Sequence, residues 1–189
     1  MFDLIQILYW LSLSTWFGGV LFIAVAAPII LRTVRENNPI MTNVLSVNLE
    51  GQHGTLLGGT IVGRIMEVVL RIQLFCAGAL LVALIGQWLY LRPRGTEMLP
   101  HIVRSVLYLA AVVLLVYQWR VIWPSIWRYR QEYIDHADEP DVANPALDKF
   151  NRYQDEGATL LFIMVGVLSL LLLLSASIRP VTTMVIPQS

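Results

Sequence analysis

The sequence predicts an all-α protein, an integral membrane four-helix bundle, and three observations predict it. The 189 residues are 57% hydrophobic and only 14% charged, against about 25% charged residues in a typical soluble domain. Four apolar stretches reach the roughly 20 residues that one helix needs to cross a bilayer core. Charged side chains fall almost entirely between these stretches or at their ends. We therefore treat residues 1–189 as a single transmembrane domain, with spans at about 4–31, 68–91, 102–123 and 158–178.

The first span, residues 4–31, contains no charged side chain. No basic segment precedes it, as a cleavable signal would require, so we expect it to remain as an anchor. Small residues spaced three, four or seven apart share a helix face and let two helices approach closely. The residues expected to pack helices in this way are Ser12, Thr15, Gly18 and Gly19 in the first span and Ala79 and Ala83 in the second.

A glycine-rich run at residues 54–66 leads into the second span. Two interpretations are open: a close-packed or re-entrant segment, and an interfacial helix that continues into the span. Small-residue spacing alone is a packing signal, which favours the interfacial helix. At its end, Glu67 and Arg71 are one helical turn apart and are expected to pair.

The third span, residues 102–123, has Arg104 near its start and Arg120 near its end. An arginine at a helix end is expected to extend its charged group to the interface. Beyond the bilayer we expect an amphipathic helical extension that bends at Pro124. Tryptophans four residues apart form an aromatic stripe on such a helix, and these candidate partner-binding residues are Trp119, Trp123 and Trp127.

An acidic connection separates the third span from the fourth. Asn144 followed by Pro145 is a typical helix start, so the last helix is expected to begin near Pro145 and to cross at 158–178. Lysine and arginine are more numerous in the two long connections than in the short one and the termini. The positive-inside rule then places the long connections in the cytoplasm and both termini on the other side of the cell membrane.

The sequence predicts no catalytic, cofactor or metal site. The histidines, His53, His101 and His136, lie in connections or at helix ends, so a haem held by two histidines within the bilayer is not expected. Cys76 has no histidine or cysteine nearby in the sequence and is expected to be a small buried hydrophobe. With 13 basic and 13 acidic residues, no net charge attracts nucleic acid.

Three motifs carry a family resemblance. Residues 16–22 read WFGGVLF and are followed by Pro28 and Arg32, residues 58–66 read GGTIVGRIM, and residues 150–154 read FNRYQ. Together they resemble the small four-helix membrane proteins of unknown function related to the transmembrane-protein-205 group. That family often has a histidine where this chain has Gln154. The resemblance covers most of the chain and implies an architecture more than an activity.

A more distant likeness is to the copper-resistance D and protoporphyrinogen-oxidase J membrane families, which also begin with a helix bearing Trp-x-Gly. They carry a histidine about two helical turns before that tryptophan. Tyr9 occupies the matching position here and cannot provide the same ligation. The resemblance therefore argues against haem or copper chemistry.

These observations favour a non-catalytic membrane protein, a structural or accessory subunit. Its expected partners are the lipid bilayer and other membrane protein subunits or a second copy of itself. The alternative is a small transporter or metal-tolerance protein. That alternative needs a polar route, for which the spans supply only hydroxyls and the amides of Gln73, Gln87 and Gln118. A haem-containing redox enzyme is a third and weaker possibility.

Overall fold

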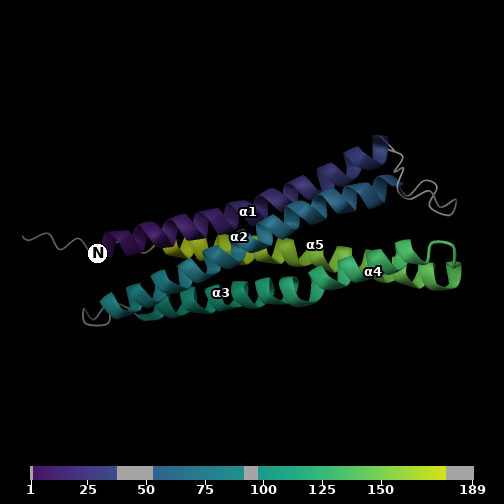
Figure 1. Cartoon of the computed structure of the whole chain (residues 1–189). Coiled ribbons are helices and arrows are strands. Elements are labelled where there is room, and N and C mark those ends of the chain that lie inside the picture. Colours follow the sequence, from purple (N-terminus) through teal and green to yellow (C-terminus); the bar gives the residue numbers. More distant parts are fainter. Residues whose placement is uncertain (1, 38–52, 92–97, 178–189) are drawn as a thin grey trace, which may run out of the picture.

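The computed structural model describes residues 2–37, 53–91 and 98–177, and all of these are helical except a short turn at 136–139. The α3, η3 and α4 segments follow one another without a break, so the described chain forms four rods (Figure 1). The elements are α1 (Phe2–Asn37), α2 (His53–Leu91), α3 (Met98–Tyr117), the π-helix η3 (Gln118–Ile122), α4 (Trp123–Asp135) and α5 (Pro140–Ser177). The predicted all-α, four-helix architecture is confirmed.

Each rod is long and apolar enough to cross a membrane, as expected of a multi-pass membrane protein. The helices α1, α2 and α5 contain 36, 39 and 38 residues. At 1.5 Å per residue they are about 54–58 Å long, nearly twice the roughly 30 Å hydrocarbon core of a bilayer. A substantial part of every rod therefore extends beyond the hydrocarbon region.

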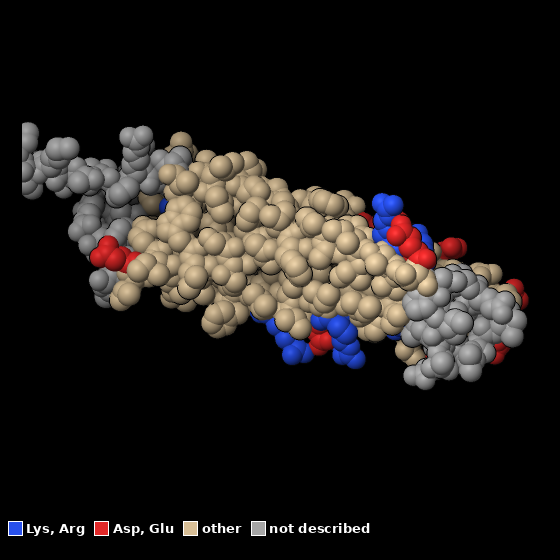
Figure 2. Space-filling view, turned by 90° about the horizontal axis from the view of Figure 1, so that it is seen from above, with Lys and Arg blue, Asp and Glu red and all other residues tan. Residues whose placement is uncertain are grey.

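The distribution of charged side chains shows which end of the rods extends beyond the hydrocarbon region. Figure 2 shows a largely uncharged surface over the half that holds the N-terminal end of α1, with basic and acidic atoms gathered towards the end that holds α4. Large apolar side chains are open on the uncharged part, as for Phe75 at 79% and Leu4 at 69% exposure. Such exposure suits contact with lipid. The predicted pair of Glu67 and Arg71 is present, with its oxygen and nitrogen 2.6 Å apart.

The rods pack as two antiparallel pairs, α1 along α2 and α4 along α5, and α5 also contacts α1 and α3. At mid-length the rods meet in one core, to which Trp16, Leu80, Leu115 and Leu168 each contribute a fully buried side chain. Lipid gives helices little hydrophobic drive to associate, so van der Waals contact within this core holds the pairs together.

The glycine-rich run forms the first turns of α2 and packs against the end of α1. A Cβ atom added at Gly54 would lie 3.0 Å from the backbone oxygen of Val34, and one at Gly58 would lie 3.2 Å from the side chain of Leu31. These glycines therefore allow a close backbone approach between α1 and α2. The run is one continuous helix with the second span.

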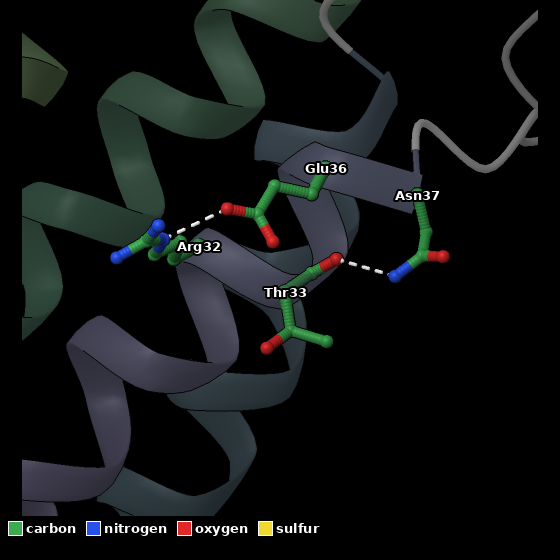
Figure 3. A network of polar contacts seen from close by, with 4 residues as sticks. All are labelled: Arg32, Thr33, Glu36 and Asn37. Carbon is green, nitrogen blue, oxygen red and sulfur yellow. Dashed lines mark hydrogen bonds and ion pairs between the residues drawn. The ribbon is translucent and has the colours of Figure 1, made fainter.

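The end of α1 is closed by local polar contacts, drawn in Figure 3. Arg32 Nε donates to Glu36 Oε1 at 2.8 Å, and Asn37 Nδ2 donates to the carbonyl oxygen of Thr33 at 2.8 Å. Both bonds are exposed, so they contribute little to stability. They are contacts between neighbouring turns of the same helix.

The last helix begins at Pro140, five residues before the predicted start at Pro145. The amides of Val142 and Ala143 both donate to the carbonyl oxygen of Glu139, which closes the first turn. Pro140 suits the first helical position because its missing N–H would have no partner there. Pro145 also lacks an N–H, but it lies in the second turn, where its absence costs one backbone hydrogen bond.

Candidate functional site

A cavity of about 200 Å³ lies between the four rods, towards their charged end. It is bounded on one side by α1 and α2 and on the other by η3, α4 and α5. Its lining is mostly apolar, with a few polar side chains: Ile23, Ala27, Leu31, Gly59, Val62, Gly63, Met66, Gln118, Ile122, Trp123, Ile126, Trp127, Arg130, Phe150, Gln154, Asp155, Gly157, Ala158 and Leu161.

Aromatic side chains facing glycines shape this cavity. The rings of Trp123 and Trp127 meet edge to face, with centroids 5.8 Å apart. A Cβ atom at Gly63 would lie 3.2 Å from the ring of Trp127 and 3.4 Å from that of Trp123. A Cβ atom at Gly59 would lie 3.9 Å from Phe150. Glycine at position 63 thus lets the two indoles reach the backbone of α2.

The π-helix η3 sets the inward face of the rod at this level. The backbone N–H of Trp123 donates to the carbonyl oxygen of Gln118, five residues earlier. Gln118 and Ile122 are both buried and line the cavity. A single π-turn within an α-helix inserts an extra residue and is frequent at functional sites. Trp119 lies outside the cavity, 40% exposed, with the guanidinium of Arg120 over its ring.

Arg130 supplies a cation at the outer end of the cavity. Its Nη2 donates to Thr60 Oγ1 at 2.6 Å and to the carbonyl oxygen of Leu56 at 3.5 Å, and its guanidinium lies 5.4 Å from the centre of the Trp127 ring. The Nε–H is buried and has no hydrogen-bond partner among the described residues. The guanidinium therefore keeps an unused donor.

A second polar cluster is buried at the opposite, uncharged end of the bundle, around Arg104. Arg104 Nε donates to Tyr9 Oη at 3.3 Å, and its Nη2 donates to Gln87 Oε1 at 3.1 Å. Tyr9 Oη is 2.5 Å from Ser175 Oγ. Arg104 is only 5% exposed, so the expectation that it extends to the interface is wrong. Its acceptors come from α1 and α2, and α5 joins the cluster through the contact of Ser175 with Tyr9.

The proton positions in this cluster follow from its chemistry. Arg104 can only donate, so Tyr9 Oη accepts from it. Ser175 Oγ spends its one proton on the carbonyl oxygen of Leu171, at 2.6 Å, and therefore accepts from Tyr9. The order of donation runs from Arg104 through Tyr9 and Ser175 to the backbone of α5.

Midway between the two ends, buried polar groups tie α1 and α3 to α2. Trp16 Nε1 donates to Gln73 Oε1 at 3.2 Å, and Tyr108 Oη donates to the carbonyl oxygen of Ala77 at 2.9 Å. The amide nitrogens of Gln73 and Gln87 have no partner in the described part of the chain. Polar groups are thus buried at three levels of the bundle.

The structure places the expected packing residues on different faces. Ser12 and Ala83 are buried, Gly19 and Ala79 are partly buried, and Thr15 and Gly18 are exposed. The expected tryptophan stripe is divided, because Trp123 and Trp127 line the cavity whereas Trp119 faces outward.

The sequence did not identify Arg130, which lines the cavity, or Ser175, which bonds Tyr9 in the cluster around Arg104. A partial signal for the cavity was present: Gly59 and Gly63 lie four apart on one helix, and so do Trp123 and Trp127 on another. Small residues on one face can accommodate large ones opposite. Nothing in the spacing showed that the two faces meet.

Within residues 2–37, 53–91 and 98–177, no group of three or more His, Cys, Asp or Glu side chains could hold a metal ion. Comparison of the chain with protein-family models, with curated proteins and with solved structures gives no match. The resemblance to the transmembrane-protein-205 group stays a prediction.

Proposed function

We propose that this multi-pass membrane protein is a non-catalytic accessory protein that holds an elongated, largely apolar molecule between its helices. The observation that supports this proposal is the cavity, because every rod contributes to its walls. Its volume of about 200 Å³ exceeds that of a cavity of about 150 Å³ that binds benzene. The volume is enough for part of one hydrocarbon chain.

The shape of the cavity favours a chain over a compact ligand. Gln118 and Arg130, which both line it, are twelve positions apart in the sequence. At 1.5 Å per residue they are separated by about 18 Å along the rod. A small volume spread over this length describes a narrow slot, which suits an acyl or isoprenoid chain.

Tryptophan fluorescence tests this proposal. An alkyl chain brominated near its middle quenches a nearby indole, so titrating it into the delipidated protein should give saturable quenching at one chain per protein. Replacing Trp123 and Trp127 together by phenylalanine should remove most of that saturable signal. Purely linear, non-saturable quenching of the unaltered protein would contradict the proposal.

A matched pair of variants tests the location. Gly59→Leu places a side chain in the cavity and should abolish saturable quenching. Gly78→Leu lies on the same helix, where an added Cβ atom meets nothing within 4 Å, and should leave quenching unchanged. Equal behaviour of the two variants would show that the probe binds elsewhere.

A small transporter is the second candidate function, favoured by the buried glutamines at successive levels of the bundle. Gln73 and Gln87 each keep an unused amide donor among the described residues, and Gln118 lines the cavity. A flux assay in liposomes tests this route. Flux that is unaffected by Gln73→Leu, Gln87→Leu and Gln118→Leu would exclude it.

The accessory role also predicts partners, either other membrane subunits or a second copy of the chain. Purification of a tagged form from its native membrane, followed by mass spectrometry, should recover a reproducible companion protein or a homo-oligomer. A monomer that purifies alone, with no companion protein, would count strongly against the accessory role.

A further inference from the structure

We propose that the ligand of this cavity is a single-chain amphiphile with an anionic headgroup, and that Arg130 binds the headgroup. This inference rests on the proposed function and adds the chemistry of the ligand. It is carried by the position of a partly buried guanidinium at the outer end of an otherwise largely apolar slot.

Among the residues that the structure describes, no acid pairs with the guanidinium of Arg130. Within that part of the chain it donates only to neutral oxygens, those of Thr60 and Leu56. None of the ion pairs found among the described residues involves it; these join Arg32 to Glu36, and Arg64 and Arg71 to Glu67. A cation held away from water is costly unless an anion or full hydrogen bonding compensates it.

The unused Nε–H of Arg130 shows where an anion could bind and compensate the charge. Arg130 Nε–H is buried without a partner in the described chain, although the side chain lines the cavity. A guanidinium is a planar fork whose N–H groups match the two oxygens of a carboxylate or phosphate. An anionic headgroup in the cavity would accept from this donor and neutralise the charge.

One acid, Asp155, also lines the cavity, and it opposes an anion. It is exposed, so water and salt weaken its repulsion. No ion pair between it and Arg130 is found. The less exposed charge, Arg130, therefore has more influence on a bound headgroup.

The remaining walls select the rest of the ligand. The slot offers apolar surface from Trp123, Trp127 and Phe150. Buried Gln118 lies about 18 Å from Arg130 along the rod. A volume of about 200 Å³ is below the roughly 300 Å³ at which pockets for drug-sized ligands begin. A compact head with part of one chain suits this space, whereas two chains side by side are too bulky for it.

Paired probes test the headgroup. Mid-chain brominated fatty acid, the alkyl phosphate of the same chain and the corresponding fatty alcohol would be titrated into the full-length delipidated protein. At least one anionic probe should bind about tenfold or more tightly than the alcohol, the effect of a hydrogen bond to a charged group. Whether the fatty acid or the alkyl phosphate binds more tightly shows whether the headgroup is a carboxylate or a phosphate.

Variants then assign the effect to one side chain. Arg130→Gln should lower affinity for the anionic probe about tenfold and leave alcohol binding unchanged. Arg128→Gln is the control, because Arg128 is on the same helix but exposed, bonded to Tyr129, and should change neither. Slow maleimide labelling of buried Cys76 in every variant shows that the core remains folded.

The outcomes separate the two proposals. Saturable binding of acid, phosphate and alcohol with equal affinity, or anion binding unaltered by Arg130→Gln, would overturn the role of Arg130 and leave the cavity as an apolar site. Absence of saturable binding for all three probes would overturn the proposed function itself.

Discussion

Arg104 is a buried cation that the described residues surround with neutral oxygens and an aromatic ring. Its guanidinium carbon lies 4.5 Å from the centre of the Tyr9 ring, and its bonded acceptors are a phenol and an amide. Tyr9 therefore acts on this charge twice, through its hydroxyl oxygen and through the face of its ring. Tyr9 and Gln87, which accept from Arg104, are 95 and 17 positions from it in the sequence. Ser175, which bonds Tyr9, is 71 positions from Arg104, so the meeting of these residues could not be read from local spacing.

Removing the Tyr9 hydroxyl should destabilise the bundle. In Tyr9→Phe, Arg104 Nε loses its acceptor and Ser175 loses its donor, which we expect to cost about 1–3 kcal/mol because the site is buried. Cys76 belongs to the same core, and its labelling by maleimide measures how often that core opens. Labelling should become about fivefold faster or more, since 1.4 kcal/mol is tenfold in an opening equilibrium.

Tyr117→Phe is the matched control for that change. Tyr117 also bonds a charged group, Glu156 Oε1 at 2.7 Å, but this contact is exposed on the surface of the bundle and lies outside the core that contains Cys76. Labelling of Cys76 should stay close to that of the unaltered protein. An equal increase in the rate of Cys76 labelling in the two variants would mean that burial does not determine how much these hydrogen bonds contribute to stability.

At the scale of helices, glycines differ according to what faces them. Gly54 faces the backbone of α1, whereas a Cβ atom at Gly78 or Gly166 would meet nothing within 4 Å. The sequence identified the glycine-rich run and the possibility of close packing. It could not distinguish glycines that allow contact from those that face outward, because that depends on the rotation of each helix within the bundle.

Gly54→Ala should destabilise the contact between α1 and α2. The added methyl group would lie 3.0 Å from Val34 O and 3.2 Å from Arg35 Cα, and backbone atoms cannot turn aside as a flexible side chain can. A lower midpoint of thermal unfolding in detergent is expected. Gly166→Ala should keep or raise the midpoint, because alanine favours a helix by up to about 1 kcal/mol over glycine; a drop as large as that of Gly54→Ala would contradict this reasoning.

At the scale of the molecule, the apolar stretches were enough to predict four membrane-crossing helices. Their full lengths were less predictable: the structure continues α1 to Asn37 and starts α2 at His53, where the spans were placed at 4–31 and 68–91. Hydropathy follows the hydrocarbon core, whereas packing between rods extends the helices past it. The cavity lies towards the end of the bundle where charged side chains gather, and all four rods form its walls. No single stretch of the sequence could therefore predict it.

The topology itself gives a prediction for the whole chain. Three crossings precede the turn after α4, and this odd number places the turn on the side opposite the N-terminus. The distribution of arginine favours the cytoplasm for that turn. With Cys76 replaced by alanine, a membrane-impermeant thiol reagent applied to intact cells should label Asp3→Cys and leave Glu139→Cys unlabelled. The reverse pattern would invert the orientation, and labelling of both would contradict four crossings.

The π-turn at 118–122 has a consequence for how this protein tolerates insertions and deletions. A π-turn holds one extra residue within an otherwise regular rod, so deleting one residue from 118–122 should let the segment close as a plain α-helix. Trp127 and Arg130 would then still face the cavity. Each residue of an α-helix advances about 100° around its axis, so the same deletion made within α4, just before Trp127, should rotate both side chains away from the cavity although neither had been altered.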